Sequence, residues 1–125
     1  MGTVMVGSVT GKGTYLIVSS QGFVALDIAM TIEEFDPAAP VVAAVSTEDA
    51  VPALDAIDRV AVAFVDERPQ AYAGSVFAQK VAERGGRVVL LGSAAEEEGA
   101  ALGFAVLERP FSTDHVTSHL SAQAG

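Results

Sequence analysis

The sequence of 125 residues contains neither cysteine nor tryptophan. Without cysteine the chain can form no disulfide, thiolate nucleophile, iron–sulfur cluster or cysteine-based zinc site. Aromatic residues amount to only 6%, and alanine and valine dominate the apolar residues. Small and β-branched side chains suit tightly packed helices and strands better than a pocket for a large ligand. The absence of cysteine also agrees with a reducing compartment, so we expect a cytoplasmic protein.

Basic residues are scarce as well. Seven Lys and Arg against sixteen Asp and Glu give a net charge of −9. Proteins that bind nucleic acid or anionic membranes usually show the opposite balance or a basic stripe. No apolar run approaches the ~18 residues that span a bilayer, and no basic stretch follows Met1 as in a signal peptide. We therefore expect neither nucleic acid nor a membrane as a partner.

Apolar residues make up 50% of the chain, enough for the core of one domain. Residues 1–13 are rich in glycine and read as a lead-in, and residues 14–125 as a single domain. Within it, continuous apolar runs recur at residues 15–18, 41–45, 60–65, 88–91 and 104–107. Runs of this kind indicate strands that are buried on both faces, as in a parallel sheet.

The stretches between the runs have helical spacing. Apolar residues three and four apart predict helices over residues 24–35, 75–84 and 94–102 and from residue 112 onward. Another helix begins after Ser46, where residues 46–49 resemble a capping box. Five strand–helix units linked by right-handed crossovers predict an α/β fold, a three-layer αβα sandwich around a five-stranded parallel sheet.

In such a sheet, functional side chains gather beyond the carboxyl ends of the strands. Asp66 can be a nucleophilic or metal-binding carboxylate, or it can simply close a strand into a turn. Ser93 can bond an oxyanion, or it can cap the next helix. A cation directly before proline, as in Arg109-Pro110, would hold a guanidinium over the crevice. The residues at this edge are Ser19, Ser20, Asp66, Ser93, Arg109 and Pro110.

Other motifs carry less weight. Residues 10–13 lack the spacing of a phosphate-binding loop, and no Gly-x-Gly-x-x-Gly follows the first strand. His115 and His119 share a helix face at a spacing of four, but no carboxylate accompanies them in a recognised metal-binding pattern. We therefore expect no metal site there and interpret the two histidines as part of a solvated or contact face.

Taken together, residues 14–122 resemble the receiver domain of two-component signalling, most of all the single-domain receivers of alphaproteobacteria. Val65-Asp66 falls at the phosphoacceptor position of that family. Leu91-Gly92-Ser93-Ala94 falls where the family ends its fourth strand with a threonine. The ending Leu107-Glu108-Arg109-Pro110-Phe111 is similar to the Leu-x-Lys-Pro-Phe of receivers. The resemblance implies a flavodoxin-like sheet of order 2-1-3-4-5, with Ser93 as the switch hydroxyl and Arg109 in place of the lysine.

The sequence also departs from the receiver pattern. Receivers hold Mg²⁺ with an acidic pair after the first strand, and Ser19 and Ser20 stand there instead. Mg²⁺ prefers hard oxygen ligands that include one or two carboxylates. We therefore expect a degenerate receiver that is not an enzyme, needs no cofactor and binds Mg²⁺ weakly or not at all. With no metal competing, Arg109 is expected to pair with Asp66.

The function that this resemblance implies is a receiver-like signal-transduction module of a phosphorelay system that acts through protein–protein contacts. A histidine kinase or another signalling protein, or a second copy of the chain, would be the partner. Two alternatives stay open: a working phosphoacceptor whose Asp66 is phosphorylated by a histidine kinase, and a small-molecule-binding αβα domain. The expected contact surface comprises Ala101, Phe104, Val106, His115 and His119.

Overall fold

The computed structural model describes residues 13–107 and 113–124. Five strands form one parallel sheet: β2 (Thr14–Val18), β3 (Val41–Ala44), β4 (Val60–Asp66), β5 (Arg87–Leu91) and β6 (Ala105–Val106). Their order is β3-β2-β4-β5-β6, which is 2-1-3-4-5 when the strands are counted along the chain. The predicted fold and strand order are therefore confirmed. Apart from Gly13, the predicted lead-in lies outside the described residues.

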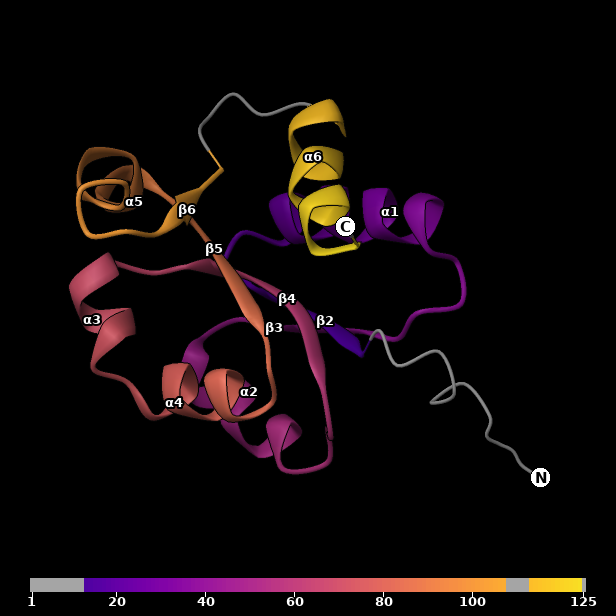
Figure 1. The fold of residues 1–125 in the computed structure, drawn as a ribbon, viewed down its shortest axis with the longest axis horizontal. Coiled ribbons are helices and arrows are strands. Elements are labelled where there is room, and N and C mark those ends of the chain that lie inside the picture. Colours follow the sequence, from indigo (N-terminus) through magenta and orange to yellow (C-terminus); the bar gives the residue numbers. More distant parts are fainter. Residues whose placement is uncertain (1–12, 108–112, 125) are drawn as a thin grey trace.

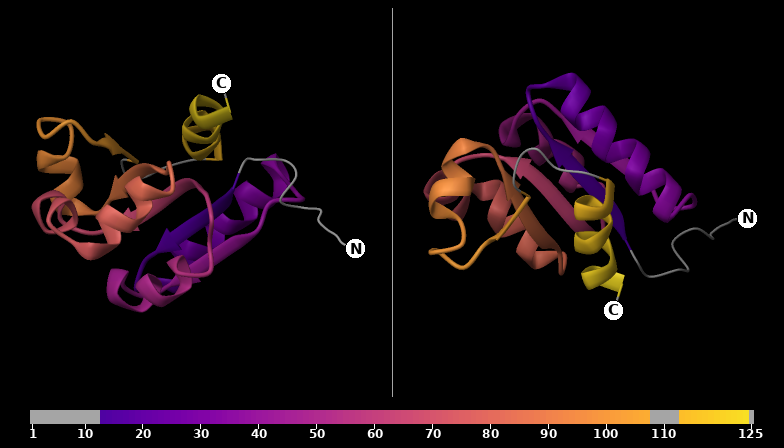
Figure 2. Two further views of the ribbon diagram at one scale, coloured as in Figure 1. Left: turned by 60° about the horizontal axis from the view of Figure 1, so that its bottom comes forward. Right: turned by 90° about the horizontal axis from the view of Figure 1, so that it is seen from above.

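Helices cover both faces of the sheet (Figures 1 and 2). On one face lie α1 (Gly22–Phe35) and α6 (Thr113–Ala124), which contact each other. The other face is covered by α2 (Thr47–Leu54), α3 (Pro69–Ala73), α4 (Val76–Glu83) and α5 (Ser93–Glu98). Within these described segments, no helix is long and apolar enough to cross a membrane.

The core consists of two clusters, one on each face of the sheet. Successive side chains of β2 alternate between them, so that Tyr15 and Ile17 join the first cluster and Leu16 and Val18 the second. The first cluster contains Ile28 and Ile32 of α1 together with apolar residues of α6. Strand β4 contributes to both, and every residue from Val60 to Val65 is buried. This double burial explains why its sequence is continuously apolar.

Two of the helix starts depend on serine side chains. Ser46 Oγ accepts a hydrogen bond of 3.1 Å from the Asp49 amide at the start of α2. Ser75 Oγ likewise accepts from the Ala78 amide, 3.1 Å away, at the start of α4. Each hydroxyl satisfies an amide that has no partner within its helix. The predicted capping sequence before α2 and the predicted start of α4 are both confirmed.

Three segments differ from the prediction. Residues 69–73 form the short helix α3, which the sequence pattern did not indicate because a single turn is too short to show helical periodicity. Proline is tolerated in a first turn, where its missing amide would have no partner, so Pro69 begins this helix. The fourth predicted helix ends at Glu98 rather than residue 102, and strand β6 has only two residues.

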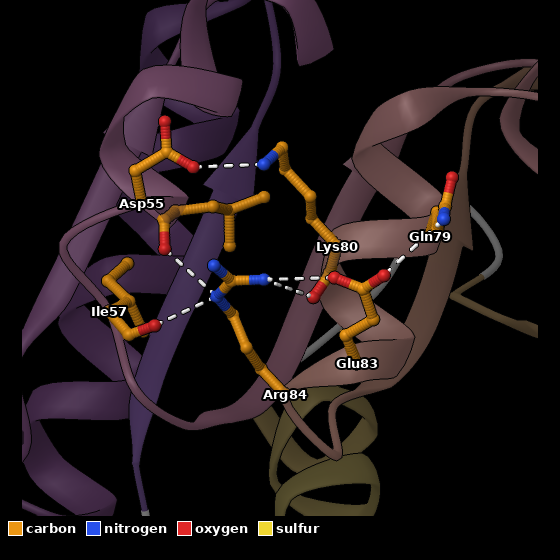
Figure 3. Close-up of polar contacts among 7 residues, drawn as sticks. Asp55, Ile57, Gln79, Lys80, Glu83 and Arg84 are labelled. Atoms are coloured by element: carbon orange, nitrogen blue, oxygen red, sulfur yellow. Dashed lines mark hydrogen bonds and ion pairs between the residues drawn. The ribbon is translucent and has the colours of Figure 1, made fainter.

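On the face opposite α1, the side chain of Arg84 joins α4 to the end of α2 (Figure 3). Arg84 Nε donates to the carbonyl oxygens of Leu54 and Ile57 at 2.9 and 2.8 Å, and Nη1 donates to that of Lys80 at 3.0 Å. Lys80 Nζ lies 2.9 Å from Asp55 Oδ1. The hydrogen bond from Lys80, together with its charge, lowers the pKa of Asp55.

Candidate functional site

The candidate site lies at the carboxyl ends of β2, β4 and β5. Val18 of β2 is the register partner of Val65 of β4, so the residues that follow them, Ser19 and Asp66, lie at the same level. Asp66, the last residue of β4, pairs in turn with Leu91 of β5. Parallel pairing therefore brings together three segments that the sequence separates by up to about seventy residues.

A glycine makes room for the Asp66 carboxylate. Gly92, directly after β5, has φ 106° and ψ 167°, a conformation that is nearly confined to glycine. A Cβ atom at this position would lie 2.6 Å from Asp66 Oδ1. The half-buried carboxylate is thus in close contact with the backbone of the neighbouring loop. The sequence analysis missed this role of Gly92, although a glycine between a buried strand and a helix is a signal for an unusual backbone conformation.

The two serines after β2 occupy different environments. Ser19 is buried, and its Oγ accepts a hydrogen bond of 3.1 Å from the Gln21 amide. Its own amide donates to the carbonyl of Ala44, 3.0 Å away. Ser20 is exposed. The Ser19 hydroxyl therefore organises the turn that leads into α1, which begins after Gln21 without a side-chain cap.

Ser93 follows Gly92 at this edge. Gly92 is the N-cap of α5 and Ser93 is the first residue of that helix, so the alternative interpretation of Ser93 as the cap is wrong. The Ser93 residue is exposed. It follows the glycine that contacts Asp66, which places a hydroxyl-bearing residue at the mouth of the site.

Few acidic side chains gather at this edge in the described part of the chain. Within residues 13–107 and 113–124, no group of three or more His, Asp or Glu side chains is arranged to hold a metal ion. Glu67, the acid next to Asp66, accepts a hydrogen bond of 2.9 Å from the Arg68 amide at the start of α3. Asp66 is then the carboxylate that faces the loop after β5, and the position after β2 contributes a hydroxyl already engaged with Gln21.

Several predicted site residues lie outside the described residues. These are Arg109, Pro110 and Phe111, so the pairing of Arg109 with Asp66 stays a prediction. Residue His115 belongs to α6, but its side chain is also outside the described part of the structure.

The expected contact surface is only partly exposed. Phe104 and Val106 are half-buried, and both pack against the second core cluster. The ring of Phe104 lies edge-on to that of Tyr72, with centroids 5.8 Å apart. Ala101 is exposed, whereas His119 is half-buried on α6, which covers the other face of the sheet. The sequence could not reveal this inward packing because β6 is too short to show a pattern.

Comparison with known proteins supports the fold. No protein-family model matches the chain, and no curated protein matches its sequence significantly. Among solved structures, the chain resembles SdrG from Sphingomonas melonis Fr1, with a TM-score of 0.67 and 22% identity over 90% of this chain and 96% of that one. A response regulator receiver protein from Sinorhizobium medicae WSM419 gives 0.58 and 24%, over 88% and 95%.

A protein described as adenylate cyclase from Rhodopirellula baltica is also similar, with a TM-score of 0.64 and 18% identity over 88% of this chain and 85% of that one. At these identities the likeness establishes the flavodoxin-like fold that receivers share. Function has to be argued from the residues at the site.

Proposed function

We propose that this chain is a receiver-like signal-transduction module of a phosphorelay system that acts through protein–protein contacts, without ordinary Mg²⁺-dependent phosphorylation. The observation that carries the proposal is the edge formed by β2 and β4. There, the carboxylate of Asp66 ends β4 at the level of Ser19, whose buried hydroxyl is engaged with the Gln21 amide. The resemblance to receivers gives the first position to the phosphoacceptor and the second to a metal-binding carboxylate. Likeness to response-regulator structures supports the signalling role.

The chemistry of phosphoryl transfer explains why this substitution matters. Transfer to a carboxylate brings negative oxygens together, and a divalent cation normally neutralises most of that charge. Mg²⁺ requires near-octahedral oxygen ligands, usually with one or two carboxylates from the protein. Here Ser19 and Ser20 supply no charge, and Glu67 is turned toward the Arg68 amide. The Asp66 carboxylate on its own would hold Mg²⁺ too weakly to support metal-assisted phosphorylation.

A module of this kind passes its signal to a protein partner. A histidine kinase or another signalling protein fits this role, and a second copy of the chain is the other candidate. The working phosphoacceptor stays the principal alternative, because Asp66 is half-buried at the edge of the sheet where that chemistry takes place.

A small-molecule phosphoryl donor tests the proposal directly. The protein is incubated with acetyl phosphate and Mg²⁺, and the aspartyl phosphate is followed by intact-mass spectrometry. We expect no phosphorylated species, and amide NMR signals near Asp66 should not saturate below about 1 mM Mg²⁺. Phosphorylation of the natural chain that disappears in Asp66→Asn would instead establish the working phosphoacceptor.

Restoring the acidic pair gives the complementary test. Ser19→Asp/Ser20→Asp should bind Mg²⁺ and gain phosphorylation of Asp66, because two carboxylates then join the site. The neutral pair Ser19→Asn/Ser20→Asn is the matched control and should gain neither property. Since Ser19 is buried, the exposed single variant Ser20→Asp provides a second comparison that disturbs the turn less. A gain of Mg²⁺ affinity in the asparagine variant would contradict the charge argument.

A further inference from the structure

Strand β3 leaves one edge of the sheet open. It is the terminal strand in the order β3-β2-β4-β5-β6 of the described chain. The carbonyl oxygen of Ala44 faces β2, where it accepts a hydrogen bond of 3.0 Å from the Ser19 amide. Because backbone groups alternate in direction along a strand, those of Val41 and Ala43 point to the open edge. Such an edge is a template for a further strand, and proteins usually cover it or interrupt it.

A groove borders the beginning of this edge, on the face of the sheet that α1 covers. Helix α1 provides one wall, and Pro37, Ala39 and Val41 form the other, around a volume of about 340 Å³. Val41 packs against the first core cluster, whereas the next residue, Val42, packs against the second. A strand that is added beside β3 would therefore place every second side chain on the face where the groove lies.

The described chain begins close to this open edge. Thr14, the first residue of β2, donates its amide to the carbonyl of Arg59, 2.9 Å away, at the amino end of the sheet. Gly13 has φ 88°, and a Cβ atom there would lie 2.7 Å from the Arg59 oxygen. Because β2 pairs directly with β3, the residues that precede Gly13 join the sheet one strand away from its open edge.

Those preceding residues include a segment that suits a strand. Residues 3–6 read Thr-Val-Met-Val, with three β-branched side chains and no charge, and Gly7 follows them. Residues 7–12 connect this segment to Gly13. Six residues span up to about 20 Å, whereas two strand spacings require only about 10 Å. A strand that returns to the amino end of β2 over this connection would run antiparallel to β3.

Charge and connection favour this segment over other occupants of the edge. Lys12 is the only charged residue within residues 1–13, whereas residues 14–58 carry eight acidic residues and no Lys, Arg or His. A segment without acidic residues is not repelled by such a surface, but a second copy of the acidic domain is. A connection of six residues also gives the segment a roughly millimolar effective concentration at the edge.

We propose that residues 3–6 add to the open edge of β3 as a further strand, antiparallel to β3 and contributed by the same molecule. Val4 and Val6 would lie over the groove beside α1, and the backbone of the added strand would pair with Val41 and Ala43. The added strand buries apolar surface and removes a template for pairing with other chains. The proposal goes beyond the proposed function, because neither phosphorylation nor a signalling partner takes part in it.

Nuclear magnetic resonance of the isotope-labelled full chain tests the pairing. We expect cross-strand nuclear Overhauser effects between residues 3–6 and residues 41–44, because antiparallel strands bring their backbone protons together. The amides of Val41 and Ala43 should also exchange slowly with solvent, since the added strand would supply their acceptors.

Matched variants of the segment locate the contact. Val4→Asn/Val6→Asn should remove the cross-strand effects and accelerate exchange of the outward amides of β3 about fivefold, from the loss of two apolar cross-strand pairs. Ser8→Asn/Thr10→Asn, in the connection between the strands, is the control. It introduces the same two side chains and should change neither measurement.

A spin label provides a second measurement, because the chain has no cysteine of its own. A nitroxide on Glu34→Cys lies on α1, one residue after Glu33 in the wall of the groove. It should broaden the amide signals of residues 3–6. Glu97→Cys is the control, since α5 contacts β5, which is separated from β3 by two strands, and this label should leave the signals sharp.

Three results would overturn the proposal. Amides of Val41 and Ala43 that exchange as fast in the natural chain as in Val4→Asn/Val6→Asn would show that no strand pairs there. Equal broadening by both spin labels would show that the segment has no fixed position. Cross-strand effects only between molecules, in a mixture of labelled and unlabelled protein that sediments as a dimer, would identify a second copy as the source of the strand. None of these results depends on the acetyl phosphate experiment, so the two proposals can fail separately.

Discussion

At the residue scale, the backbone of Gly92 and the side chain of Asp66 lie so close that each restricts the other. The backbone of Gly92 adopts φ 106°, and its missing side chain leaves room for Asp66 Oδ1. Any other residue at position 92 would be destabilised twice: its backbone would be strained at this φ, and its Cβ atom would clash with the Asp66 carboxylate. The orientation of the Asp66 side chain is therefore set partly by a residue that carries no functional group.

Gly92→Ala is expected to lower the free energy of unfolding by about 1–3 kcal/mol, the usual cost of a disallowed backbone conformation, and by more if Asp66 has to move. Gly85→Ala is the matched control. Gly85 also has a positive φ, 72°, but nothing lies within 4 Å of a Cβ atom there, so about 1 kcal/mol is expected. Urea unfolding of the two variants measures the difference.

A double-mutant cycle identifies the part of this cost that comes from the carboxylate. Asp66→Ala removes the atom that the new methyl group would meet, so Gly92→Ala should cost less in that background. If Gly92→Ala costs the same with and without the Asp66 carboxylate, the close approach does not influence stability.

Also at the residue scale, Tyr72 makes a pH-dependent contribution to the free energy of unfolding. Its ring contacts those of Phe77 and Phe104 edge-on, and burial raises its pKa from 10.0 to about 12. The folded state therefore holds the phenolic proton more tightly than the unfolded state. Linkage requires that this contribution to stability is complete below pH 10 and is lost as the pH rises toward about 12.

Tyr72→Phe should make the free energy of unfolding less sensitive to alkaline pH. Urea midpoints of the natural chain and the variant, compared at intervals above pH 8, measure the effect. Tyr15→Phe is the comparison, because burial and the charge of Asp36 also raise the pKa of Tyr15, so part of the sensitivity should persist in each variant. Identical pH profiles for Tyr72→Phe and the natural chain would contradict this account.

At the scale of elements, α2 and α4 are connected by one guanidinium. Arg84 donates to three carbonyl oxygens, two of which lie at or just beyond the end of α2. Carbonyls at the end of a helix have no partner within it. Arg84, directly after α4, therefore donates hydrogen bonds to carbonyl groups at the end of α2. These bonds hold the two helix ends at a fixed separation.

Arg84→Gln should lower the free energy of unfolding by about 1–3 kcal/mol, because partly buried carbonyl groups lose a charged donor. The control is Arg68→Gln, which removes the same charge from an exposed residue and should have a much smaller effect. Chemical denaturation of both variants provides the measurement. Equal effects would mean that net charge, rather than the hydrogen bonds of Arg84, determines the change.

The same elements show how far the sequence predicts the fold. Strand β4 was predictable because it is buried on both faces, so that nearly every residue in it is apolar. Helices α2 and α4 were predictable from Ser46 and Ser75, whose caps are local. Helix α3 and the short β6 were not, because elements of five and two residues contain too little periodicity and depend on contacts such as that between Tyr72 and Phe104.

The site was predictable only in part, for a similar reason. Strand ends located Ser19, Asp66 and Ser93, because parallel strands place their carboxyl ends at one edge. The roles of Gly92 and of the Ser19 hydroxyl depend on dihedral angles and on the register between strands. Neither quantity is local in the sequence, so residue types alone could not reveal these contacts.

At the scale of the whole molecule, strand β4 contributes side chains to both core clusters. Phe64 of β4 belongs to the cluster beneath α1 and α6, and its neighbour Val65 belongs to the cluster on the other face. The chain also contains only two tyrosines and no tryptophan. Tyr15 lies in the first cluster and Tyr72 in the second. Each core cluster therefore contains one tyrosine, whose fluorescence can report on the unfolding of that cluster.

Because β4 belongs to both cores, the two faces are expected to unfold in one cooperative transition. Tyr72→Phe leaves Tyr15 as a reporter of the first core, and Tyr15→Phe leaves Tyr72 as a reporter of the second. In each variant the tyrosine fluorescence and the far-ultraviolet circular dichroism should give the same urea midpoint. Phe64→Leu, added to each, should lower the free energy of unfolding by about 1–2 kcal/mol as seen by either reporter. A Tyr72 signal that changes at lower urea than the circular dichroism would show instead that the second face, with α2 to α5, melts independently of the first.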